Sequence, residues 1–163
     1  MKLYFLRHGI AADPGDWNGR DADRPLTREG VARMEREARA MEDLSLDLDA
    51  IVTSPLLRTR QTAEIVANRL GLRKVLTADD RLAGSFDIKG CAAILADHAG
   101  ATALMLVGHE PSLSVTAGQL AGKATLEIKK GALVGIELFG PASSRGTLFC
   151  LIPPKLLSAL GSS

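Results

Sequence analysis

Cysteine is scarce in this sequence, and the two that occur, Cys91 and Cys150, form no CxxC pair and no regular spacing. The sequence therefore indicates neither a disulfide framework nor a cysteine-based metal site. Isolated cysteines of this kind usually behave as small buried hydrophobic side chains, and we expect this of both. This cysteine usage favours a reducing, cytoplasmic location.

Long apolar runs and an excess of one charge are also missing. No stretch approaches the roughly 18 apolar residues of a transmembrane helix, and the apolar run at residues 3–6 is too short for a signal peptide. Twenty basic and nineteen acidic side chains leave a net charge of +1. We therefore expect no membrane and no nucleic acid as partner, and any attraction for anions must come from local clustering.

The composition is that of an ordinary globular protein. Its 163 residues are 46% hydrophobic and 24% charged, with no internal repeat, linker or low-complexity segment. This length suits one domain with a substantial core. We therefore expect residues 1–163 to form a single domain and the protein to be a monomer.

Strand and helix patterns alternate along most of the chain. Short strands are predicted at 2–6, 48–54, 74–77 and 102–107, and helices after Thr27, from Ser54–Pro55 to Gly71, and at 88–98 and 112–120. Residues 125–140 and 146–154 instead alternate and break at glycine, as antiparallel edge strands do. The sequence predicts a three-layer α/β/α sandwich with a mostly parallel central sheet and an antiparallel edge.

Polar side chains follow three of the predicted strands at the point where each strand ends. Arg7 and His8 follow the first strand, Arg58 lies one helical turn after Ser54, and His109 follows the apolar strand before it. Ligands of parallel α/β sheets bind outside the carboxyl ends of the strands. We therefore expect these residues to converge on one site.

Two arginines beside two histidines point to phosphate chemistry. The planar guanidinium group matches phosphate oxygens, whereas neighbouring guanidinium groups repel a metal cation. No HxxxH pair, HxH pair or GxSxG motif occurs, which leaves an imidazole as nucleophile. Taken singly, each residue has an ordinary alternative: a turn residue for His8, a surface charge for Arg7, a solvated helix face for Arg58.

Four segments carry a resemblance to a known family. "LRHG", "SPLLRTRQTAE" and "VGHEP" occur in the order of the three motifs of the histidine phosphatase (phosphoglycerate mutase-like) superfamily. With "DRPLTREG" and the short length, the chain most resembles the SixA-type phosphohistidine phosphatases. The resemblance covers residues 1 to about 140 and implies a phosphoglycerate mutase-like fold.

The resemblance also implies roles for individual residues. His8 would accept the phosphoryl group, Arg7 and Arg58 would bind its oxygens, and His109 would donate to them. Arg24 would line the pocket or its rim, or would simply belong to the entry of a helix. No metal or cofactor is implied. The expected substrate is phosphohistidine on a protein, with a small phosphate ester or a non-catalytic phosphate-binding module as alternatives.

Two features depart from the pattern of many superfamily members. Residues 72–103 contain no clear patch for the usual acidic proton donor, and Asp79, Asp80 and Asp87 are either candidates or ordinary loop carboxylates. No large cap insertion is present, so we expect an open groove suited to a protein substrate and to a phosphoramidate leaving group. Trp17 would lie on the rim of this groove or pack against the fold.

Overall fold

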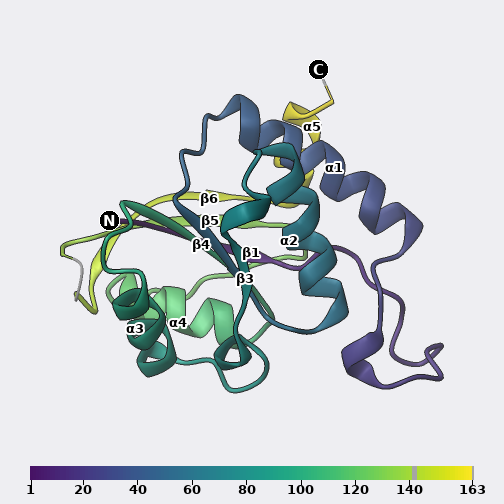
Figure 1. Cartoon of the computed structure of the whole chain (residues 1–163), viewed down its shortest axis with the longest axis horizontal. Coiled ribbons are helices and arrows are strands. Elements are labelled where there is room, and N and C mark those ends of the chain that lie inside the picture. Colours follow the sequence, from purple (N-terminus) through teal and green to yellow (C-terminus); the bar gives the residue numbers. More distant parts are fainter. Residues whose placement is uncertain (141–142, 163) are drawn as a thin grey trace.

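The computed structural model describes residues 1–140 and 143–162, which form helices on both faces of one sheet (Figure 1). The sheet order is β3-β2-β4-β1-β5-β6. The strands are β1 (Lys2–Arg7), β2 (Ala50–Thr53), β3 (Leu76–Ala78), β4 (Ala103–Gly108), β5 (Leu133–Leu138) and β6 (Gly146–Ile152). β3, β2, β4 and β1 are parallel, whereas β5 pairs antiparallel with β1 and β6 pairs antiparallel with β5. The predicted fold class is confirmed.

Two helical layers bury the two faces of the sheet. The helices α1 (Arg28–Asp43), α2 (Leu57–Arg69) and α5 (Pro154–Leu160) cover one face, and α3 (Ile88–Asp97) and α4 (Ser112–Leu120) cover the other (Figure 1). Leu3 and Phe5 of β1 pack in one core cluster and Tyr4 and Leu6 in the other, because successive strand residues point to opposite faces. All six residues of β4 are buried, as the continuous apolar run predicts.

Helix starts follow the capping residues in the sequence. The Thr27 hydroxyl accepts a hydrogen bond from the Gly30 N–H at 2.9 Å, so α1 begins where the sequence places it. Asp87 caps α3 in the same way, accepting from the Gly90 N–H at 2.8 Å. These local bonds fix the entry of each helix onto the sheet.

Several details differ from the sequence-based expectations, among them the strand predicted within residues 125–140, which begins only at Leu133. The sequence does not predict helix α5. Its seven residues begin at the second of two prolines and are too few to show a helical period. The third strand begins at Leu76, since Arg73–Val75 form the 3-10 helix η2. Cys91 is buried, but Cys150 on β6 is only half-buried. In residues 1–140 and 143–162, no helix is long and apolar enough to cross a membrane.

The loop between β1 and α1 projects beyond the sheet (Figure 1). It contains the 3-10 helix η1 (Asp21–Asp23) and follows directly from the carboxyl end of β1. Another 3-10 helix, η3 (Asp80–Leu82), follows the carboxyl end of the edge strand β3. The carboxyl edge of the sheet therefore carries irregular segments, which can position polar side chains.

Candidate active site

His8 is the first residue after β1 and is only 6% exposed. Its backbone N–H donates to the Gly108 carbonyl at 3.1 Å, which ties it to the end of β4. Its Nδ1 lies 2.8 Å from the Gly9 carbonyl oxygen. A carbonyl oxygen only accepts, so Nδ1 carries the proton and Nε2 of the neutral ring keeps a free electron pair.

Gly9 lies between α2, to which it is hydrogen-bonded, and α1, which packs closely against it. Its N–H donates to the Thr62 hydroxyl of α2 at 3.0 Å, and this hydroxyl donates to the Arg58 carbonyl at 2.8 Å. A Cβ atom on Gly9 would lie 2.7 Å from Cγ of Met34 in α1. The close approach of α1 explains why glycine follows His8.

His109 faces His8 from the neighbouring strand end. The two ring centroids are 5.4 Å apart and the rings are inclined by 54°. Nε2 of His109 lies 2.8 Å from the hydroxyl oxygen of Ser54, which is fully buried after β2. The parallel strands β1, β4 and β2 therefore bring their carboxyl ends together as the sequence predicts.

Asp21 of η1 joins two arginines. Arg58 donates to the Asp21 carbonyl at 2.9 Å and to its carboxylate at 3.0 Å, while Arg24 donates to the same carboxylate at 3.1 Å. Arg24 also donates to the Ala12 carbonyl at 2.7 Å. Partial burial raises the pKa of Asp21, but both guanidinium groups outweigh this effect and the net shift is downward.

Arg7 is anchored by the segment before β5. Its Nη1 donates to the Ile128 carbonyl at 2.9 Å, and its own carbonyl accepts from the Gly131 N–H at 3.1 Å. Burial lowers the pKa of Arg7, although the negative charge of Glu110 opposes this. Arginine remains charged in proteins even when its pKa is lowered. Arg7 is therefore a fixed positive charge next to His8.

The surroundings keep both imidazoles neutral. Burial, with smaller contributions from His109, Arg58 and Arg7, lowers the pKa of His8 from 6.5 to about 3 despite its bond to the Gly9 carbonyl. Burial and Arg58 lower the pKa of His109 to about 4, although Asp21 opposes them. At neutral pH the site therefore presents two uncharged imidazoles among fixed positive charges.

Unused hydrogen-bonding capacity is concentrated here. Among the described residues, five buried side-chain nitrogen or oxygen atoms have no partner, and three of them are Arg7 Nε, Arg58 Nε and His109 Nδ1. Buried polar atoms without partners are rare and call for an explanation. A tetrahedral oxyanion matches such a set of nitrogen atoms.

Comparisons with known proteins agree with this geometry. Residues 3–84 match the model of the histidine phosphatase superfamily, branch 1. An uncharacterized protein of Picosynechococcus sp. (strain ATCC 27264 / PCC 7002 / PR-6) is 39% identical over 169 residues, covering 96% of this chain and 99% of its own. The chain belongs to the histidine phosphatase superfamily. The phosphohistidine phosphatase SixA of Escherichia coli K12 is 25% identical over 122 residues, 74% of each chain.

Solved structures of several proteins share the fold of this chain. The protein histidine phosphatase SixA complexed with tungstate superposes with a TM-score of 0.85, at 24% identity over 95% of this chain and 98% of its own. The alpha-ribazole phosphatase of Shigella flexneri gives 0.77 at 17% identity, over 94% and 97%. The phosphoglycerate mutase of Bacillus anthracis str. Sterne gives 0.71 at 15% identity, over 99% and 96%. The phosphoglycerate mutase-like fold is therefore confirmed.

The three aspartates considered as proton donors do not lie with His8 and His109. They follow β3, which β2 and β4 separate from β1. Asp79 accepts from the Arg81 N–H and pairs with its guanidinium group, Asp87 caps α3, and Asp80 is exposed. Their hydrogen bonds and exposure are those of capping and loop carboxylates.

Two residues of the candidate active site are not predicted from the sequence. Asp21 bridges Arg58 and Arg24, and its only sequence signal is a spacing of three residues from Arg24. Thr62 holds Gly9, and its signal is a spacing of four residues from Arg58, which puts both on one helix face. Trp17 lies in the same loop as Asp21 and donates to the Arg20 carbonyl at 3.0 Å.

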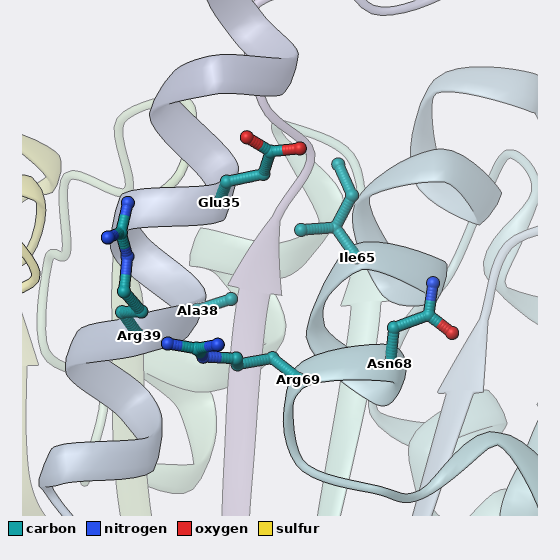
Figure 2. A pocket seen from close by; sticks show the side chains of 6 residues that line it. All are labelled: Glu35, Ala38, Arg39, Ile65, Asn68 and Arg69. Atoms are coloured by element: carbon teal, nitrogen blue, oxygen red, sulfur yellow. The ribbon is translucent and has the colours of Figure 1, made fainter.

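A hollow of about 440 Å³ between α1 and α2 is separate from this site. Figure 2 shows Glu35 and Arg39 of α1 and Ile65 and Arg69 of α2 around it. Arg58 is in the first turn of α2, roughly 10 Å or more along the axis from Ile65. This hollow therefore belongs to the packing of two helices, with charged side chains at its rim.

Proposed function

We propose that this histidine phosphatase hydrolyses phosphohistidine on a partner protein through a phosphoryl intermediate on His8. The observation that carries the proposal is the 2.8 Å contact between His8 Nδ1 and the Gly9 carbonyl. It fixes the tautomer in which Nε2 is unprotonated and nucleophilic. Burial of His8 keeps this form populated well below neutral pH.

The reaction divides into two displacements. First, Nε2 of His8 attacks phosphorus and the bond from phosphorus to the substrate imidazole breaks; the leaving nitrogen keeps the electron pair and takes a proton from solvent. Second, a water oxygen attacks phosphorus, the bond to Nε2 breaks, phosphate leaves and the water's proton passes to solvent. Arg7, Arg58 and His109 surround the transferring group, whose oxygens carry the negative charge.

The positive charge in this scheme comes from guanidinium groups rather than from a metal or another cofactor. Arg58 and Arg24 are mostly buried and Arg7 is half-buried, so their charges act in a poorly solvated site. Arg24 supports the site through Asp21, which it shares with Arg58. A clamp of this kind stabilises a phosphoryl group directly.

A phosphoramidate substrate suits a site without a dedicated proton donor. Its leaving imidazole is a modest base and needs less help from an acid than a sugar alkoxide does. The side chains of Asp79 and Asp87 cap η3 and α3, respectively. Similarity to SixA in sequence and in fold also supports this substrate class.

We expect the enzyme to work as a cytoplasmic monomer.

A pair of substrates tests the proposal. The chain should hydrolyse phosphohistidine on a histidine-phosphotransfer domain with a higher kcat/KM than p-nitrophenyl phosphate. His8→Ala should lower kcat/KM by about 10³-fold or more, as loss of a nucleophile does. His98→Ala is the matched control, because His98 ends α3 and makes no contact with the site. Normal turnover by the His8 variant would contradict the mechanism.

A small-molecule phosphomonoesterase is the second candidate. The likeness to an alpha-ribazole phosphatase, a TM-score of 0.77, shows that this fold also occurs in a phosphatase named for a small molecule. A much higher kcat/KM on small phosphate esters than on phosphohistidine proteins would favour this candidate. Phosphate binding without any turnover would instead indicate a non-catalytic module.

A further inference from the structure

A basic groove of about 450 Å³ lies beside the candidate active site. Its charged lining residues are Arg7, Arg33, Lys129, Lys130 and Lys155, and the others are apolar or proline. They come from β1, from α1, from the segment before β5 and from the start of α5. Among residues 1–140 and 143–162, no acidic residue lines this groove, although the whole chain has a net charge of only +1.

Most of this positive charge is available to a ligand. Among the described residues, Lys130 and Lys155 have no carboxylate within 4.0 Å, and both are exposed. Lys129 has Glu127 at 3.6 Å, with both side chains largely exposed, so this pair is weak. Only Arg33 has a close buried partner, Glu37 at 2.9 Å.

The groove shares Arg7 with the proposed phosphoryl site. This residue lines the groove, and its charge also contributes to lowering the pKa of His8. A ligand with its phosphoryl group at His8 can therefore extend over the lysines. Because these lysines are exposed, flexible and carried by separate segments, they suit several carboxylates spread over a surface. Fixed, bidentate donors would match a compact second phosphate group better than these lysines, which act as point charges.

Building on the proposed function, we propose that this groove binds an acidic segment of the phosphoprotein substrate next to its phosphorylated histidine. Carboxylates facing the lysines speed encounter and select this partner, with an effect that weakens as salt is added. The groove then determines which phosphohistidine proteins are dephosphorylated, while the histidine pair performs the reaction.

Two peptides test this inference by binding alone. Each carries a non-hydrolysable phosphohistidine analogue, flanked by glutamates in one and by glutamines in the other, and affinity is measured by fluorescence anisotropy at about 0.05 M salt. The wild type should bind the glutamate peptide about tenfold more tightly, and K130E/K155E should lose this preference. The control K74E/K89E makes the same charge change on η2 and α3 and should keep it.

The outcomes separate the groove from the reaction. Equal affinity of the wild type for both peptides, or an unchanged preference in K130E/K155E, would overturn the proposal. So would lysine-dependent inhibition by a small bisphosphate together with equal peptide affinities, which would indicate a small-molecule subsite. The wild type should hydrolyse phosphoimidazole, and K74E/K89E should hydrolyse it equally, within about twofold. If the wild type fails to hydrolyse it, the proposed function fails, and the peptide affinities still decide the role of the groove.

Discussion

His8 combines a fixed tautomer with a strongly lowered pKa. The Gly9 carbonyl holds the proton on Nδ1, and burial together with His109, Arg58 and Arg7 keeps a second proton off Nε2. A free imidazole would lose its nucleophilic form on mild acidification. This one would not, because its environment disfavours the charged ring.

The pH dependence of kcat/KM follows from these values. In the proposed mechanism the neutral form of His8 is the active one, and it is lost only as the pH falls through a pKa of about 3, with His109 titrating at about 4. After correction for the second ionisation of the substrate phosphate, near pH 6, kcat/KM for p-nitrophenyl phosphate should stay level down to about pH 5. A fall centred near pH 6.5 would show an ordinary histidine.

Asp21 offsets part of the positive charge that the site presents to phosphate. Its carboxylate pairs with Arg58 and Arg24 at 3.0 Å. Asp21→Asn should therefore bind product phosphate several-fold more tightly, since a negative charge is removed, and should turn over more slowly, since the arginines are held less firmly.

The inhibition constant of phosphate measures this effect at fixed pH. Asp23→Asn is the control, because Asp23 lies in the same 3-10 helix but pairs with Arg20, at 2.8 Å, and with no arginine of the candidate site. Equal inhibition constants for the wild type and both variants would refute this account of Asp21.

At the scale of elements, the first turns of α2 organise the site. Arg58 reaches Asp21 of η1, the Gln61 side chain accepts from the Leu26 N–H at 2.8 Å, and Thr62 holds the Gly9 N–H. These contacts join the helix to both ends of the loop between β1 and α1. The motif in residues 54–64 therefore positions this loop as well as supplying an arginine.

Replacement of Thr62 by valine tests this positioning role. The change keeps the shape of the side chain but leaves the buried Gly9 N–H without a partner, which costs about 1–3 kcal/mol. We expect kcat to fall about tenfold or more with a smaller change in KM, because His8 is displaced. Thr116→Val is the control: this hydroxyl on α4 has no partner among the described residues, so its loss should leave activity unchanged.

Glu37, a residue of α1, makes the free energy of unfolding of the protein depend on pH. It is fully buried, and burial raises its pKa from 4.5 to about 7 against the effects of Arg33 and Arg36. Between pH 4.5 and 7 the folded state binds more protons than the unfolded one, so the free energy of unfolding falls as pH rises. The full effect is about 3 kcal/mol.

Urea denaturation of Glu37→Gln at pH 5 and pH 8 measures this contribution. Relative to the wild type, the variant should become more stable by about 2–3 kcal/mol on going from the lower to the higher pH. Glu35→Gln, an exposed position on the same helix, should show no such difference. A pH-independent difference for Glu37→Gln would mean that this carboxyl titrates normally.

At the scale of the whole molecule, the sequence predicts the layers and the place of the site but not every contact in it. Periodicity and capping residues locate α1, α3, α4 and the buried strand β4 because these features are local. The meeting of His8 and His109 follows from parallel strands that share one edge. These parts of the structure depend on few contacts between residues that are distant in the sequence.

The remaining features depend on tertiary contacts. Asp21 becomes a site residue only because the long loop after β1 folds back onto α2, which no short spacing encodes. The helix α5 is stabilised by burial of Leu157 against α1 rather than by a pattern of its own. The basic groove combines residues from positions 7 to 155 and is visible only in three dimensions.

The most direct test of the central claim is to trap the phosphoryl group on the enzyme. The wild type is mixed with a phosphohistidine protein labelled in its phosphoryl group, quenched rapidly in alkali and mapped by peptide. The account predicts label on the peptide that contains His8, none with His8→Ala, and normal labelling with His98→Ala. Turnover without any labelled enzyme, or label that persists in the His8 variant, would contradict it.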